Sequence, residues 1–250
     1  MRIIAIIPAR MGSSRFPGKP MAKLLGKPMI GHVYERVAQN KQLLLTAVAT
    51  CDTEIADYIH SIGGKAVMTS ESHERASDRC AEALEILEQD LGERFDIVVM
   101  VQGDEPMTHP EMISEAIQPL IEDHTVLVSN LLGEIDSVTE FEDRNCIKVV
   151  CDKKSDAVYM SREPIPTRSK VPTVSMKKQV CIIPFQRNFL LQYTALEPTP
   201  LEIIESIDML RVLEHGLKVR MIPTKYPTHA VDTTADLQQV EYLMSQADFE

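Results

Sequence analysis

The sequence predicts an α/β protein with a doubly wound, mostly parallel sheet and a small mixed or antiparallel lobe. In the first 101 residues, short apolar runs alternate with segments whose apolar residues recur at helical spacing. The runs at 3–7 and 97–101 are apolar on both faces, as expected of parallel strands covered by helices on both sides. Later strands follow one another without long helices between them, which favours an antiparallel or mixed arrangement.

The first half of the chain is expected to alternate regularly. Gly63 and Gly64 end the second helix, since glycine adopts the left-handed backbone of a helix C-terminus at little cost. Pro110 begins the fourth helix. The predicted strands are 3–7, 43–50, 65–69 and 97–101, and the predicted helices are 30–39, 55–62, 76–91 and 110–120.

The second half is less regular. Thr199 and Glu202 form a capping box with Pro200 between them, which predicts one helix that runs to His215 and stops at Gly216. The segment 167–176 is rich in serine, lysine and proline and is expected to be a mobile loop. Strands are predicted at 126–132, 147–151, 157–160, 179–185 and 219–222, with a last helix through Leu237, Val240 and Met244.

Composition limits the classes of function. The formal net charge of -11 over 250 residues argues against a nucleic-acid backbone or an anionic membrane as the main partner. The five cysteines show no CxxC spacing and are expected to be reduced, as in a cytosolic protein. No signal peptide and no run of about 18 apolar residues is present, so the expected location is the cytoplasm.

A cationic loop follows the first strand. Arg10, Arg15 and Lys19 lie within ten residues and alternate with serines and glycines, so backbone N–H groups and cationic side chains can converge on one anion. The Pro17–Gly18 pair opposes helical geometry there. The loop therefore predicts a phosphate site, and a surface loop that is merely basic is the alternative.

Asp104 is a candidate Mg²⁺ ligand by its position. Asp104 lies in the motif QGDEP directly after the strand 97–101, and Mg²⁺ prefers hard oxygens shared between one or two carboxylates and substrate phosphates. A turn is the alternative explanation of this motif. Asp232 follows another short strand, and taken alone it would be a helix N-cap.

These motifs resemble those of the CMP-Kdo synthetases, the 3-deoxy-manno-octulosonate cytidylyltransferases. The segments PARMGSSRFPGKP and, from Gly26 to Arg36, GKPMI-HVYER carry the resemblance, which continues along almost the whole chain. It implies a Rossmann-like nucleotidyltransferase fold over residues 1–250, with a nucleotide-binding half at 1–125, an acceptor and dimerisation half at 126–232, and a C-terminal helix at 233–247. It also implies a homodimer, whose interface we expect within 147–185.

The resemblance assigns roles to individual residues. It implies that Asp104 and Asp232 contact the metal and that Gln102 lies near cytosine or the sugar. Arg79, in HERASDR, corresponds to the arginine that helps hold the base, although Arg75-Ala76-Ser77 replaces Ser-Gly-Thr. The triphosphate of CTP would be wrapped by Arg10, Ser13, Arg15 and Lys19.

The acceptor side departs from the family pattern. Gln179 stands in KQVCIIPF where the family has KHxGIYAY, and Asp208 stands in IDMLR where the family has LEQLR. Lost hydrogen-bonding partners for a polyol are costly in specificity, so a smaller acceptor such as phosphonoformate is an alternative to Kdo. Arg162, in SREPIPTR, is a candidate for an acceptor carboxylate or a partner subunit.

The predicted reaction is nucleotidyl transfer, in which an acceptor oxygen attacks the α-phosphorus of CTP and pyrophosphate leaves. Arg15 and Lys19 would stabilise the charge that develops on pyrophosphate and Asp104 would hold Mg²⁺, so no protein nucleophile is needed. A nucleotide-binding module without catalysis is the competing class. A dinucleotide oxidoreductase is disfavoured because no GxGxxG follows the first strand, and Gly103-Asp104-Glu105 is not the DxD of sugar transferases. The acceptor and the strictness for CTP stay open.

Overall fold

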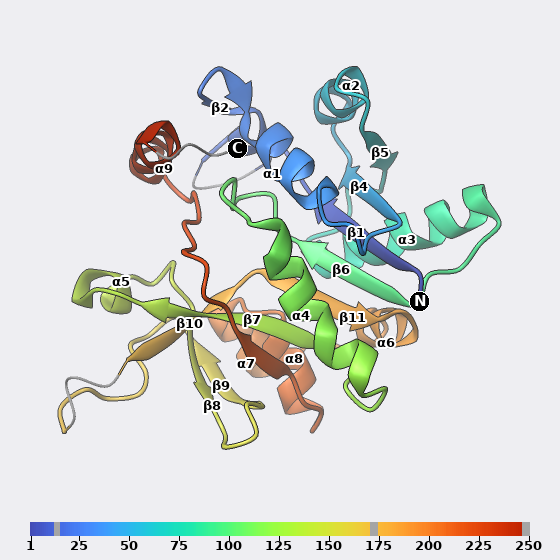
Figure 1. The fold of residues 1–250 in the computed structure, drawn as a ribbon. Coiled ribbons are helices and arrows are strands. Elements are labelled where there is room, and N and C mark those ends of the chain that lie inside the picture. Colours follow the sequence, from blue (N-terminus) through green and yellow to red (C-terminus); the bar gives the residue numbers. More distant parts are fainter. Residues whose placement is uncertain (13–15, 171–174, 247–250) are drawn as a thin grey trace. The chain divides into compact units, whose positions relative to one another are not determined.

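The computed structural model describes residues 1–12, 16–170 and 175–246 (Figure 1). The chain forms two compact units, each described by itself. The first comprises Met1–Ser114 together with Pro227–Glu250, and the second comprises Glu115–Tyr226.

The first unit is built on parallel strands in the order β6-β1-β4-β5. β1 pairs with β4 on one side and with β6 on the other, so β1 is an inner strand and every apolar residue of IIAII is buried. The predicted α/β class with a parallel sheet is confirmed. Its elements are β1 (Ile3–Pro8), α1 (Met29–Ala38), β4 (Leu45–Thr50), α2 (Thr53–Ser61), β5 (Lys65–Met68), α3 (Ala76–Leu91) and β6 (Ile97–Val101).

The strand order of the first unit reverses at β1. The chain moves outward from β1 to β4 and β5, and α3 then returns it past β4 and β1 to β6 on the other side. In open parallel sheets, ligands bind beyond the carboxyl ends of the strands at such a reversal. The loops that follow β1 and β6 therefore flank the expected ligand position.

The C-terminal helix α9 (Thr234–Gln246) belongs to the first unit although it is distant in sequence. Its Val240 and Met244 are buried in one apolar cluster with Leu24 and Met29. A short hairpin of β2 (Lys23–Leu24) and β3 (Lys27–Pro28) carries Leu24 into this cluster. The hairpin was not predicted from the sequence. The cluster holds the segment before α9 against the strand-end loops.

The second unit contains a mixed sheet with the order β12-β7-β10-β8-β9, in agreement with the predicted mixed lobe. β12 runs parallel to β7, whereas β7, β10, β8 and β9 pair antiparallel in turn. Its strands are β7 (Ser129–Ile135), β8 (Lys148–Cys151), β9 (Ala157–Ser161), β10 (Met176–Val180), β11 (Ile182–Gln186) and β12 (Arg220–Pro223), and its helices are α5 (Val138–Glu142), α6 (Arg187–Thr194), α7 (Pro200–Glu205) and α8 (Met209–Glu214). α4 (Pro110–Glu122) carries the chain from the first unit into the second.

Two predictions for the second unit were wrong. The helix expected up to His215 is two helices, because Ser206 has a left-handed backbone, with φ of 53°, and ends α7. The strand expected at 179–185 is also divided at Cys181, and β10 already begins at Met176, inside the segment predicted as a mobile loop. Residues 171–174 of that loop lie outside the described residues. α5 and α6 were not predicted.

Across the described part of the chain, none of the helices has the length and the apolar character needed to cross a membrane.

Candidate active site

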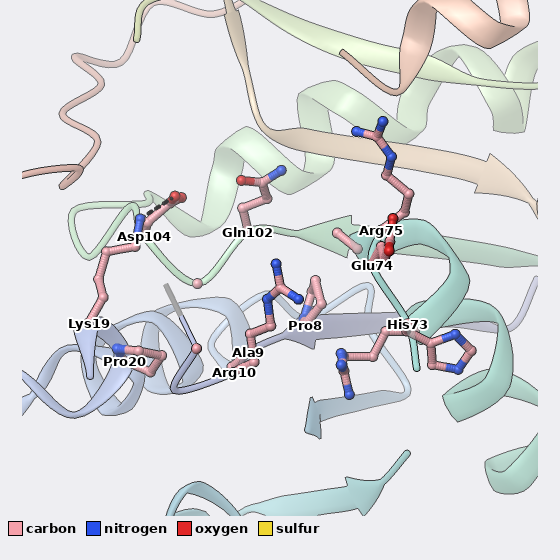
Figure 2. A pocket seen from close by; sticks show the side chains of 14 residues that line it. Pro8, Ala9, Arg10, Lys19, Pro20, His73, Glu74, Arg75, Gln102 and Asp104 are labelled. Carbon is pink, nitrogen blue, oxygen red and sulfur yellow. Dashed lines mark hydrogen bonds and ion pairs between the residues drawn. The ribbon is translucent and has the colours of Figure 1, made fainter. Parts of the chain in front are cut away.

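A pocket of about 300 Å³ lies at the carboxyl ends of β1 and β6 and beside the start of α3, within the first unit (Figure 2). Its wall combines a cationic loop, a carboxylate loop and the first turn of a helix, which is the arrangement that the strand reversal predicts. The lining residues are Pro8, Ala9, Arg10, Gly12, Lys19, Pro20, His73, Glu74, Arg75, Ala76, Arg79, Gln102, Gly103 and Asp104.

The Lys19 ammonium is bound by three oxygens. Its Nζ donates to Oδ2 of Asp104 and to the carbonyl of Val231, each at 2.9 Å, and to Oδ1 of Asp232 at 3.3 Å. The side chains of the three charged residues are only 14–19% exposed. Figure 2 shows Lys19 facing Asp104. The two carboxylates predicted as metal ligands are therefore brought to one point by a shared cation.

The electrostatics of Lys19 follow from this arrangement. Burial by itself lowers the pKa of the ammonium, but attraction and hydrogen bonds from Asp104 and Asp232 raise it above its usual value. Lys19 therefore carries a full positive charge at neutral pH.

Lys19 is placed by the end of its own loop. Gly18 has φ of +72°, a left-handed conformation that L side chains rarely adopt, and its N–H donates to the carbonyl of Met11. A 3₁₀ turn, Lys19–Met21, begins directly afterwards, and Pro20 within it is buried. The predicted role of Pro17–Gly18, to keep the segment out of a long helix, agrees with this turn.

A main-chain hydrogen bond holds Val231, the residue before Asp232, against Asp104. The N–H of Val231 donates to the carbonyl of Asp104 at 2.8 Å, and the Val231 side chain is fully buried in the cluster beneath α9. Thr233 and Asp236 form a reciprocal cap at the start of α9, since the Asp236 N–H donates to the Thr233 hydroxyl and the Asp236 carboxylate accepts the Thr233 N–H. Asp232 thus precedes the N-cap, and its carboxylate faces Lys19.

Arg79 contributes a buried cation to the wall of the pocket. It is 3% exposed, and its Nη1 donates to the hydroxyl of Thr69 at 2.6 Å. Its Nη2 is buried and has no hydrogen-bond partner among the residues that the structure describes. A buried donor without a partner costs free energy, so a ligand with an acceptor at this position would be favoured.

Asp52 lies outside the pocket but supports its cationic loop, and the sequence assigned it no role. Its Oδ2 accepts the N–H of Met11 at 2.8 Å, so it holds the start of the cationic loop. Its position could have indicated this role, because Asp52 follows β4 at the same edge of the sheet as the other loops of the site.

Other predicted site residues are distributed as follows. Arg10 and Gln102 both line the pocket, with Gln102 directly after β6. Ser13 and Arg15 lie outside the described residues. Arg162, Gln179 and Asp208, predicted to bind the acceptor, belong to the second unit.

The three second-unit residues have partners within that unit. The Nε of Arg162 donates to the carbonyl of Glu205 at 2.7 Å. The side-chain amide of Gln179 donates to Asn130 at 2.6 Å. The main-chain carbonyl of Asp208 accepts the Tyr193 hydroxyl at 2.9 Å.

The donor set around Lys19 fits a Mg²⁺ ion of the kind shared with a substrate. Nowhere in residues 1–12, 16–170 and 175–246 does the structure place three or more His, Cys, Asp or Glu side chains as a metal-binding group. Asp104 and Asp232, however, already converge on one cation. Mg²⁺ is usually held by one or two carboxylates and completed by water and substrate phosphates, so two carboxylates suffice.

Comparison with known proteins shows what the chain is related to. The family model of the cytidylyltransferases matches residues 4–220. The chain belongs to the cytidylyltransferase family. Its sequence is 40% identical to the 3-deoxy-manno-octulosonate cytidylyltransferase of Geobacter metallireducens, covering 98% of this chain and 99% of that protein. The enzyme of the same name from Trichlorobacter lovleyi is 42% identical over 98% of this chain and all of that protein.

A solved structure supports the same conclusion. A CMP:2-keto-3-deoxy-manno-octonic acid synthetase complexed with CTP superposes with a TM-score of 0.89 and 36% identity, covering 98% of this chain and 99% of that one. The family resemblance read from the sequence is therefore confirmed, as is the enzyme class, nucleotidyltransferase. A cytidylyltransferase from Leptospira borgpetersenii shares only 17% identity at a TM-score of 0.64, which shows a common fold.

Proposed function

We propose that this cytidylyltransferase uses Mg²⁺ to couple CTP to an acidic sugar, forming CMP-Kdo and releasing pyrophosphate. The observation that carries the proposal is the convergence of Lys19, Asp104 and Asp232 beside the pocket at the ends of β1 and β6. The identity of about 40% to two enzymes named for this reaction, over nearly their full length, supports the choice of acceptor.

In the proposed reaction an acceptor hydroxyl oxygen bonds to the α-phosphorus of CTP, the bond to the bridging oxygen of pyrophosphate breaks, and the hydroxyl proton passes to solvent. Arg10 and Lys19 would hold the triphosphate and offset the charge that develops on pyrophosphate. Mg²⁺, held by Asp104 and Asp232, would supply charge neutralisation at the α-phosphate and lower the pKa of the acceptor hydroxyl. No nucleophilic side chain is required.

Arg79 supports recognition of the nucleobase. Its unpartnered Nη2 is a buried donor in the pocket wall, and the carbonyl oxygen of a pyrimidine is a matching acceptor. A pocket that leaves a buried donor unsatisfied discriminates against ligands without that acceptor. The preference for CTP over other triphosphates remains part of the proposal.

The acceptor side is where the chain departs from the family pattern. Gln179 and Asp208 replace residues that hold sugar hydroxyls in the family pattern, and Arg75 adds a cation to the wall of the pocket. These departures favour a smaller or more acidic acceptor, such as phosphonoformate, as the second candidate. Arg162, Gln179 and Asp208 would be the residues that distinguish the two.

Pyrophosphate release tests the proposal. The purified protein would be incubated with CTP, Mg²⁺ and one acid at a time, from Kdo, 8-amino-Kdo, sialic acid and phosphonoformate. We expect release with Kdo, and its loss in Asp104→Ala but not in the matched control Asp57→Ala, whose carboxylate lies on the exposed face of α2. Pyrophosphate release with phosphonoformate alone would mean that the reaction is as proposed but the acceptor is not Kdo. No release with any acid would favour a non-catalytic nucleotide-binding protein.

We also propose that the enzyme is a homodimer, as the family resemblance implies, with an interface within 147–185. In that region Val158 of β9 is 60% exposed, and a dimer interface would remove this apolar side chain from water. The mass in solution, measured by light scattering during size exclusion, is expected to be that of two chains and to fall to one in Val158→Asp. A wild-type monomer at micromolar concentration would contradict the proposal.

A further inference from the structure

The Lys19 ammonium lies among three oxygens of the kind that ligate Mg²⁺. The oxygens around it come from Asp104, Val231 and Asp232, so two of the three carry negative charge and the third is a main-chain carbonyl. Such a set of hard oxygens is suited to Mg²⁺. In this structure an internal cation occupies the space between these oxygens.

An ammonium and a divalent ion compete for these oxygens. The Nζ atom lies 2.9 Å from the Asp104 oxygen and 3.3 Å from the Asp232 oxygen. A Mg²⁺ ion in the position of the ammonium would approach the same oxygens to about 2.0–2.1 Å, and Nζ could not stay beside it. Two cations in contact repel strongly where the side chains are mostly shielded from water. Entry of the metal therefore requires the ammonium to leave.

Lys19 can leave without a change of backbone. Its Cα is held by the 3₁₀ turn Lys19–Met21, while its four-carbon stem ends in the wall of the pocket that Arg10 also lines. A lysine ammonium is a point charge with no fixed hydrogen-bonding plane, so it exchanges one set of oxygens for another easily. Phosphate oxygens bound in the pocket would provide such a set.

We propose that Lys19 is an internal counter-cation that keeps the Asp104–Asp232 pair closed to divalent metal until a nucleotide phosphate draws the ammonium away. Metal binding is then conditional on nucleotide binding, and Lys19 couples the two by leaving the carboxylates for the phosphate. This inference rests on the proposed function, because it takes the triphosphate as the anion that engages Lys19.

Binding of Mn²⁺, followed by the paramagnetic resonance signal of the free ion, tests the proposal without turnover. In the absence of nucleotide, Lys19→Met is expected to bind Mn²⁺ at least about tenfold more tightly than the wild type, because the competing charge is removed. Lys27→Met is the matched control, since Lys27 in the hairpin strand β3 pairs with the partly exposed Glu35 of α1. Equal Mn²⁺ affinity in wild type and Lys19→Met would overturn the proposal.

Thermal unfolding gives an independent measurement. Lys19 offsets the repulsion between the two carboxylates, so Lys19→Met is expected to melt below the wild type in chelator and to recover on addition of Mg²⁺. The melting temperature of the wild type is expected to rise little on addition of Mg²⁺ alone. Should Lys19→Met fail to fold, Lys19→Met/Asp232→Asn retains one carboxylate and removes the repulsion. An unstable double variant would show that Lys19 acts through packing and would contradict the proposal.

The nucleotide arm completes the test. With CTP and no acceptor, the wild type is expected to bind Mn²⁺ beyond what the same CTP binds in buffer, and the difference between wild type and Lys19→Met is expected to shrink. If the wild type binds Mn²⁺ equally well with and without CTP, metal binding does not depend on nucleotide binding and the proposal is wrong. Neither result depends on pyrophosphate release, so the inference and the proposed reaction can fail separately.

Discussion

The main-chain N–H of Met11 donates to a carboxylate oxygen of Asp52 over 2.8 Å. This bond ties the start of the cationic loop, which follows β1, to the residue that follows the neighbouring strand β4. Loops at binding sites function when a rigid scaffold positions them, and this one is anchored near each end: at Met11 by Asp52, and at Gly18 by a hydrogen bond back to Met11.

Asp52→Ala is predicted to raise the KM for CTP by about tenfold, because a charge-assisted hydrogen bond of ~1.5 kcal/mol that holds the loop is lost. The change in kcat should be smaller, since Asp52 does not line the pocket. Steady-state kinetics with Asp57→Ala as the control would measure this. An unchanged KM would mean that the loop is held by other contacts.

Arg79→Met is predicted to weaken CTP binding by about tenfold while leaving the protein folded. The substitution keeps an apolar stem in the pocket wall but removes the buried donor that a base would satisfy. Isothermal titration with CTP would give the affinity, and Arg94→Met, at an exposed position beyond α3, is the control. Equal affinities would show that Arg79 does not contact the nucleotide.

Arg211→Met is predicted to lower the free energy of unfolding by about 3–5 kcal/mol. Arg211 binds both oxygens of Glu202, whose side chain is fully buried, and its guanidinium lies over the ring of Tyr193. Removing one partner leaves a buried charge uncompensated. Urea unfolding would show the loss, and Glu202→Gln/Arg211→Met should recover part of it. A loss below about 1 kcal/mol would contradict this explanation.

Asp156→Asn is predicted to reduce stability at neutral pH by about 2 kcal/mol. Burial raises the pKa of Asp156, but hydrogen bonds from Lys218 and Arg220 lower it overall below its usual value. Because the pKa of Asp156 is lower in the folded state, its charge stabilises the protein at any pH above the unfolded-state pKa of about 3.9. This contribution is lost as the pH falls through the lower, folded-state pKa.

Urea unfolding at pH 7 and near pH 3 would check this prediction. The difference between wild type and Asp156→Asn should narrow at the lower pH. A difference that is independent of pH would mean that Asp156 stabilises the fold through its shape and hydrogen bonds as a neutral group, without a contribution from its charge.

The sequence predicted most of the first unit because its signals are local. The run IIAII indicated a buried strand, and the apolar stripe at 76–91 indicated a helix whose bounds the structure reproduces as α3. The motif after β6 placed Asp104 at the pocket. The cationic loop also predicted the position of Arg10 and Lys19 in the pocket. This loop follows β1, and ligands of such sheets bind beyond the carboxyl ends of the strands.

The sequence predicted the second unit less well for a physical reason. A single left-handed residue, Ser206, divides one helical pattern into α7 and α8, and its capping geometry is not visible in the periodicity of apolar residues. The break at Cys181 between β10 and β11 likewise depends on pairing partners. Both features are decided by long-range packing, which overrides local propensity.

The residue types of the candidate site were determined by the sequence alone: a lysine, an arginine and two aspartates in loops after strands. Only the tertiary structure decided that Lys19, Asp104 and Asp232 meet at one point, although 213 positions separate the first from the last. The buried side chain of Val231 beneath α9 and the hydrogen bond from its N–H to Asp104 bring the distant aspartate to the strand-end loops. Such a contact arises from burial of apolar surface between remote segments, and no local pattern of residues encodes it.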